Sequence, residues 1–125
     1  MIVDDEPDIT LSIEQSLKET GLFDVFKFNN SLEVLSNFKS GMYDLLIFDV
    51  RMPEMDGIEL LREVRKVDDK VRICFLTALS ELKEYESSIS QICPTLNEDY
   101  IIRKPIDNKE LVRRINHILN SDRVT

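Results

Sequence analysis

The chain has 125 residues, of which 42% are hydrophobic and 32% are charged, and its formal net charge is −8. This length fits one domain. The acidic balance argues against direct binding of nucleic acid, whose phosphates require basic patches. No run approaches the ~20 apolar residues of a membrane span, and the opening residues do not resemble a signal peptide. We therefore expect a soluble, cytoplasmic domain over residues 1–121, with 122–125 as a tail or the start of a linker.

Short apolar runs alternate with longer segments of helical period. The segment Leu45–Asp49 begins with four successive apolar residues, which is typical of a central parallel strand buried on both faces. The other candidate strands are Met1–Asp4, Val25–Phe28, Val71–Leu76 and Tyr100–Arg103. Because the first strand is short, we expect further residues upstream of it. The end of the chain suits either a stand-alone protein or one that continues into another domain.

Helices are predicted between these strands from apolar residues that repeat every three or four positions. Pro7 fits a first helical turn and Gly21 a helix stop. Asp56 and Asp107 each begin an acidic variant of the capping box. The predicted helices cover Asp8–Thr20, Ser31–Lys39, Asp56 through Val64, Ser80–Ile92 and Asp107 through Ile118.

Five strand–helix units in succession predict an α/β fold, a doubly wound parallel sheet with helices on both faces. In such sheets ligands bind beyond the carboxyl ends of the strands. The residues at these ends are therefore candidates for the site. They are Asp4-Asp5-Glu6, Asp49, Thr77-Ala78 and Lys104-Pro105.

Three aspartates, Asp4, Asp5 and Asp49, would share this pocket with one cation, Lys104. Two unit charges about 4 Å apart repel by roughly 4 kcal/mol at an effective dielectric of about 20. Either some carboxyls are protonated or a cation lies among them. Mg²⁺ is the natural candidate, because it prefers oxygen ligands and tolerates a site completed by water.

The same residues suggest phosphoryl chemistry. A carboxylate such as that of Asp49 can attack a phosphoryl group and become an aspartyl phosphate. The transferred charge must then be balanced by a metal and by donors. The Lys104 ammonium, the Thr77 hydroxyl and the Ala78 N–H group are candidate donors. We therefore interpret Asp49 as the nucleophile.

Four segments in this order resemble the receiver domain of two-component response regulators, the CheY-like superfamily. They are Val3–Pro7, Asp49–Gly57, Thr77-Ala78 and Lys104-Pro105. The resemblance spans nearly the whole chain. It implies a flavodoxin-like fold with a five-stranded sheet of order 2-1-3-4-5 and five helices.

The resemblance also implies a role for each matching residue. Asp49 would be the phosphoacceptor, Thr77, Ala78 and Lys104 would bind the phosphoryl oxygens, and Pro105 would follow a cis peptide bond. Mg²⁺ would be held by Asp4, Asp5, Asp49 and the backbone carbonyl of Arg51.

The same resemblance implies partners. The donor would be a sensor histidine kinase or a phosphotransfer protein, and a downstream output protein or domain would read the phosphorylated state. The chain would be a signalling domain with self-catalysed phosphorylation chemistry at most, not an enzyme. Oligomeric state is left open, a homodimer included.

Two departures from the family pattern concern how phosphorylation is read out. An aromatic residue commonly lies three positions before the lysine, where this chain has Ile101, with Tyr100 one position earlier. Either the aromatic switch is absent or the strand register differs. In addition, residues 92–98 look like an enlarged loop before the fifth strand.

Three other functions match parts of this sequence pattern. An aspartate-nucleophile phosphatase would place an acid two positions after the nucleophile, where this chain has Arg51. A flavodoxin-like cofactor binder would need a phosphate loop after the first strand, where Asp4-Asp5-Glu6 would repel phosphate. A pseudo-receiver acting only as an interaction module stays open because of the unusual region before the fifth strand.

Overall fold

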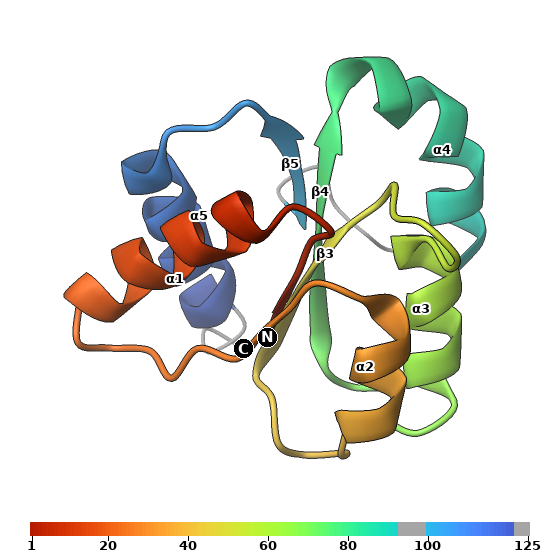
Figure 1. Ribbon diagram of the computed structural model, residues 1–125, viewed down its shortest axis with the longest axis horizontal. Helices are drawn as coiled ribbons and strands as arrows, with labels where there is room; N and C mark the ends of the chain where they lie inside the picture. The colour runs from red at the N-terminus through yellow and green to blue at the C-terminus, as the bar shows by residue number, and fades with distance from the viewer. Residues whose placement is uncertain (93–99, 122–125) are drawn as a thin grey trace.

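The computed structural model describes residues 1–92 and 100–121, and its strands form one parallel sheet (Figure 1). The sheet has five strands in the order β2-β1-β3-β4-β5, so the order implied by the resemblance is confirmed. The strands are β1 Ile2–Val3, β2 Lys27–Phe28, β3 Leu45–Asp49, β4 Arg72–Ala78 and β5 Ile101–Lys104. The predicted enlarged loop lies outside the described residues except for Ile92.

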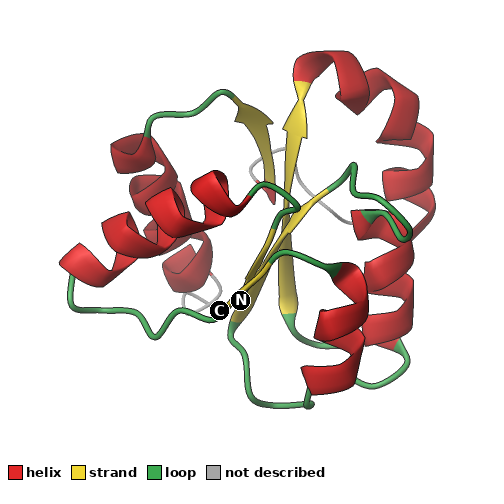
Figure 2. Ribbon diagram, in the orientation of Figure 1, coloured by secondary structure: helices red, strands yellow, loops and turns green. Residues whose placement is uncertain are grey.

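Helices cover both faces of the sheet (Figure 2). Two of them, α1 and α5, pack on one face, and the other three pack on the opposite face. The helices are α1 Pro7–Glu19, α2 Ser31–Asn37, α3 Gly57–Arg65, α4 Leu79–Ile92 and α5 Asn108–Ser121. Among the residues described, no helix is both long and apolar enough to cross a membrane.

The central strand β3 is buried at all five positions. Its side chains alternate between the two faces, as a pleated strand requires. Leu46 and Phe48 join the core under α2, α3 and α4, whereas Leu45 and Ile47 join the core under α1 and α5. The prediction of a two-sided central strand is therefore confirmed, and β3 delivers Asp49 to the sheet edge from within the core.

The helix boundaries follow the predicted signals closely. The Asp56 carboxylate accepts a hydrogen bond from the Glu59 N–H at 2.8 Å, and Asp107 accepts one from the Lys109 N–H at 2.9 Å. Gly21 follows α1 with a φ of +71°, a conformation that glycine adopts without steric cost. The caps therefore fix where α1, α3 and α5 start or stop.

Other boundaries differ from the prediction. The helix α2 ends at Asn37, two residues before Lys39, because Phe38 turns to an extended conformation and its ring stacks on Tyr43 at 5.6 Å. The strand β4 runs on through Thr77 and Ala78, since these residues pair with β5. The strands β1 and β2 are shorter than predicted.

Candidate functional site

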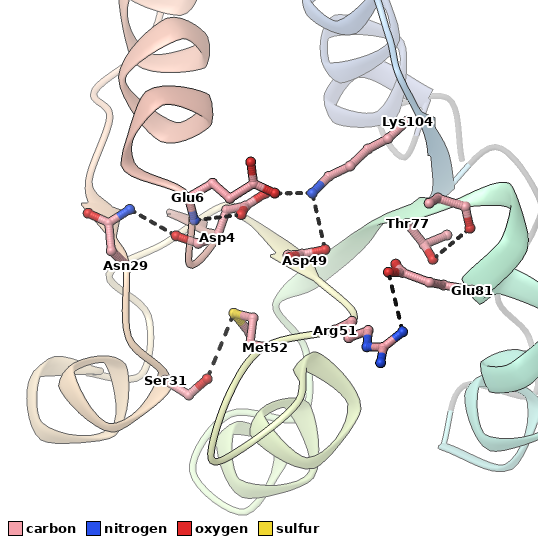
Figure 3. Close-up of polar contacts among 11 residues, drawn as sticks. Asp4, Glu6, Asn29, Ser31, Asp49, Arg51, Met52, Thr77, Glu81 and Lys104 are labelled. Atoms are coloured by element: carbon pink, nitrogen blue, oxygen red, sulfur yellow. Dashed lines mark hydrogen bonds and ion pairs between the residues drawn. The ribbon is translucent and has the colours of Figure 1, made fainter.

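The carboxyl ends of β1, β3 and β5 meet at one edge of the sheet (Figure 3). The Lys104 Nζ lies 2.8 Å from an Asp4 carboxylate oxygen and 3.3 Å from an Asp49 carboxylate oxygen. It therefore joins the first and third strands by two ion pairs. These groups adjoin a cavity of about 440 Å³ lined by Asp5, Glu6, Asp49, Arg51, Met52, Pro53, Ala78, Glu81 and Lys104.

Asp4 is fully buried and is held at each of its polar atoms. Its N–H group donates to the Phe28 carbonyl at 3.2 Å, and its own carbonyl accepts from the Asn29 amide at 2.8 Å. One carboxylate oxygen accepts from the Glu6 N–H at 3.0 Å, and the other accepts from Lys104. A charge this deep is tolerated only when it is paired in this way.

The three aspartates can converge on a metal ion. Asp4, Asp5 and Asp49 each offer a carboxylate oxygen, and these oxygens all lie within 4.8 Å of one another. Asp5 is partly exposed, so one side of the cluster is open to water. An all-oxygen donor set with room for water fits a hard divalent cation. Arg51, the fourth residue expected at the metal, lines the same cavity.

The electrostatics of the pocket favour an added cation. Burial, together with the nearby Asp4 carboxylate, raises the pKa of Asp49 to about 7 against the opposing effect of Lys104. Burial also pulls the pKa of Lys104 down, but its hydrogen bond to Asp4 and the charge of Asp49 outweigh this effect and raise it. Lys104 thus stays charged, and one ammonium does not balance three carboxylates.

Thr77 and Ala78 are both beside the pocket but differ in orientation. Ala78 lines the cavity. Thr77 is fully buried, and its hydroxyl donates to the Ala78 carbonyl at 3.2 Å. To reach a group on Asp49, this hydroxyl would have to rotate away from that carbonyl.

The residues expected to take part in switching lie on opposite faces of the sheet. Ile101 pairs with Phe75 in the ladder and packs with the core under α4. Tyr100 packs with the core under α1 and α5. The ladder thus puts the aliphatic residue, not the aromatic one, on the α4 side. The peptide bond between Lys104 and Pro105 is cis, as the resemblance implied.

Several residues near the site were not predicted from the sequence. The Glu81 carboxylate, on α4, lies 3.9 Å from the Arg51 guanidinium. Asn29 contacts Asp4 in the loop after β1, and Ser31 contacts Met55 in the loop after β3. Gly57, at the start of α3, has no room for a side chain, since a Cβ there would lie 2.3 Å from the Asp49 carbonyl oxygen. Only Gly57 had a sequence signal, its place in the Asp49–Gly57 segment.

Comparison with known proteins gives a consistent result. Residues 1–116 match the response regulator receiver domain family. The chain is 36% identical over 119 residues to the transcriptional regulatory protein CpxR homolog of Haemophilus influenzae, covering 95% of this chain and 49% of that protein. It is 29% identical over 120 residues to the chemotaxis protein CheY of Bacillus subtilis, covering 96% of each.

A solved CheY-like receiver domain from Methanospirillum hungatei superposes with a TM-score of 0.78 at 25% identity, covering 98% of this chain and 93% of that one. The chain spans about half the length of several curated transcriptional regulators that it matches. The family match, the sheet order and the aspartate pocket lead to one conclusion: the chain belongs to the response regulator receiver domains of two-component systems.

Proposed function

We propose that the chain accepts a phosphoryl group on Asp49 in a Mg²⁺-dependent reaction. The observation that carries this proposal is the placement of the Asp49 carboxylate, at the edge of an open cavity and 3.3 Å from the Lys104 ammonium. Asp4, Asp5, Asp49 and the Arg51 carbonyl would hold the metal, whose contribution is to neutralise charge on the phosphoryl oxygens.

In the proposed step an oxygen of the ionised Asp49 carboxylate attacks phosphorus and forms a new O–P bond. The bond between phosphorus and the donor's histidine nitrogen breaks, and its electron pair stays on the imidazole. Lys104 is already within reach of the incoming oxygens. The Ala78 N–H group and the rotated Thr77 hydroxyl supply further hydrogen bonds. Aspartate is regenerated when water later hydrolyses the acyl phosphate.

The proposed partners are those that membership of the receiver family implies. The donor is the phosphohistidine of a sensor histidine kinase or a phosphotransfer protein, met in the cytoplasm. The recipient of the signal is a downstream output protein or domain. Because Ile101 carries no ring or hydroxyl, the output cannot depend on an aromatic side chain that turns inward at this position.

The proposal predicts Mg²⁺-dependent uptake of a single phosphoryl group from a small-molecule phosphodonor such as acetyl phosphate. Intact-protein mass spectrometry should show one added phosphoryl mass in the wild type and none in Asp49→Asn. Chelation of the metal should abolish the addition. A pseudo-receiver would show no addition under any condition, and labelling that persists unchanged in Asp49→Asn would refute the assignment.

A further inference from the structure

The turn between β2 and α2 contacts both loops that form the aspartate pocket. We define this β2–α2 turn as residues 29–31. One loop follows β1 and carries Asp4 and Asp5, and the other follows Asp49, the last residue of β3, and carries Arg51. Asp4 and Asp5 come from the first loop, whereas Asp49 and Arg51 come from the end of β3 and the loop that begins there, so the separation of these two segments affects the distances between the ligand oxygens.

Asn29 joins the turn to the first loop. Its side-chain amide donates to the Asp4 carbonyl at 2.8 Å and to the Thr10 hydroxyl at 2.9 Å. The Thr10 hydroxyl in turn donates to the Pro7 carbonyl at 3.1 Å. The amide thus connects to both ends of the segment that contains Asp5; Figure 3 shows its contact with Asp4.

Ser31 joins the turn to the second loop. Ser31 is only 2% exposed, and its hydroxyl donates to the Met55 carbonyl at 2.7 Å while lying 3.9 Å from the Met52 sulfur. The same loop contains Glu54 at a φ of +68°. A left-handed conformation costs a residue other than glycine roughly 1–2 kcal/mol, so it persists only where surrounding contacts hold it.

The two contacts have a consequence for metal binding. Mg²⁺ demands a nearly ideal octahedral arrangement of its oxygens, and groups that orient the ligands commonly matter almost as much as the ligands. We propose that Asn29 and Ser31 are positioning residues, which hold the two ligand loops at the separation that Mg²⁺ requires. This inference rests on the proposed function of the pocket and extends it to residues that do not touch the metal.

Two nearby residues of the same types provide matched controls, because their side-chain hydrogen bonds join only α2 and its N-cap and reach neither ligand loop. Asn30 caps that helix by accepting from the Leu32 N–H at 2.7 Å. The Ser36 hydroxyl donates to the Leu32 carbonyl at 3.1 Å. Removing the Asn30 cap should cost about 1 kcal/mol of stability. The Asn30→Ala variant therefore shows what a loss of stability alone does to metal binding.

The experiment is a Mg²⁺ titration followed by amide NMR spectra, which report folding and metal affinity together. Asn29→Ala and Ser31→Ala should each raise the Kd about tenfold, whereas Asn30→Ala and Ser36→Ala should stay within about twofold of the wild type. Ser31→Ala removes one hydroxyl only, so it keeps the test decisive should Asn29→Ala disturb the fold.

The results separate the two proposals. If all four variants bind Mg²⁺ with the wild-type Kd, the positioning roles are wrong while the proposed function stands. If the Kd for Mg²⁺ rises equally in the test variants and in the controls, those roles are also wrong, because the change would then reflect lost stability alone. If the wild-type protein does not bind Mg²⁺, the proposed function itself fails, and the inference fails with it.

Discussion

The Asp49 carboxyl is buried beside another aspartate, which makes its ionisation costly to the folded protein. Its pKa rises from 3.8 to about 7, chiefly through burial. Between pH 3.8 and about pH 7, the folded protein therefore holds a proton on Asp49 that the unfolded chain has already released. Holding this proton stabilises the folded protein relative to the form with an ionised Asp49. The stabilisation is fully present below pH 4 and is lost as the pH rises through 7, provided no metal is bound.

Asp49→Asn should therefore stabilise the metal-free protein at pH 8. Each pKa unit corresponds to about 1.4 kcal/mol, and water at the open side of the pocket screens part of this electrostatic cost. We therefore expect the free energy of unfolding to increase by about 1–2 kcal/mol in Asp49→Asn. Urea unfolding in a chelator at pH 8 and pH 4 measures it. The gain should vanish at pH 4, and a wild type as stable as the variant at pH 8 would contradict the account.

At the residue scale, the sequence predicted which residues meet at the strand ends better than it predicted their contacts. The order of Asp4, Asp49 and Lys104 at strand ends was enough to predict that they meet. The orientation of the Thr77 hydroxyl was not predictable, because spacing does not determine a rotamer. Asn29 and Ser31 were missed because their partners on the two ligand loops, Asp4 and Met55, lie more than 20 residues away in the chain.

Elements were predictable where a strong local signal marked them. Four apolar residues identified β3, and Asp56 identified the start of α3. The short strands β1 and β2 were less well bounded, since their ends depend on pairing with neighbours rather than on their own residues. The extension of β4 through Thr77 and Ala78 likewise depends on β5, which is distant in the sequence.

The join between β3 and α3 gives a prediction for Gly57. Alanine usually favours a helix by about 1 kcal/mol over glycine. Here its Cβ would lie 2.3 Å from the Asp49 carbonyl oxygen, so the strand end or the helix must shift. Gly57→Ala should lower the free energy of unfolding by about 1–3 kcal/mol and should slow phosphorylation of Asp49.

The control for this prediction is Gly41→Ala. Gly41 has a φ of +79° and open space around it, so alanine there costs about 1 kcal/mol of stability far from the site. Urea unfolding and the rate of labelling by the phosphodonor would be measured for both variants. Gly41→Ala should label at the wild-type rate, and a normal rate in Gly57→Ala would show that the close approach does not matter to the site.

At the scale of the whole molecule, the net charge of −8 should assist the binding of Mg²⁺. The negative field concentrates cations near the pocket, and salt screens it over a Debye length of about 10 Å at 0.1 M and about 3 Å at 1 M. Because salt screens this field, the Kd for Mg²⁺ should rise on the order of several-fold when NaCl replaces an uncharged osmolyte. A Kd independent of salt would show that only the ligands themselves attract the ion.

The whole architecture was the most predictable feature. Strand–helix alternation predicted the α/β class, and the resemblance added the sheet order that the structure confirms. How the phosphorylated state is read out was the least predictable feature, because Ile101 departs from the family pattern and residues 93–99 lie outside those described.

The central claim is that Asp49 itself carries the phosphoryl group, and the most direct measurement locates the bond. After incubation with Mg²⁺ and acetyl phosphate, borohydride reduction converts an aspartyl phosphate to homoserine, which peptide mass spectrometry can assign to one position. We predict homoserine at position 49 in the wild type. Homoserine at Asp4, Asp5 or another acid, with Asp49 unmodified, would contradict the account.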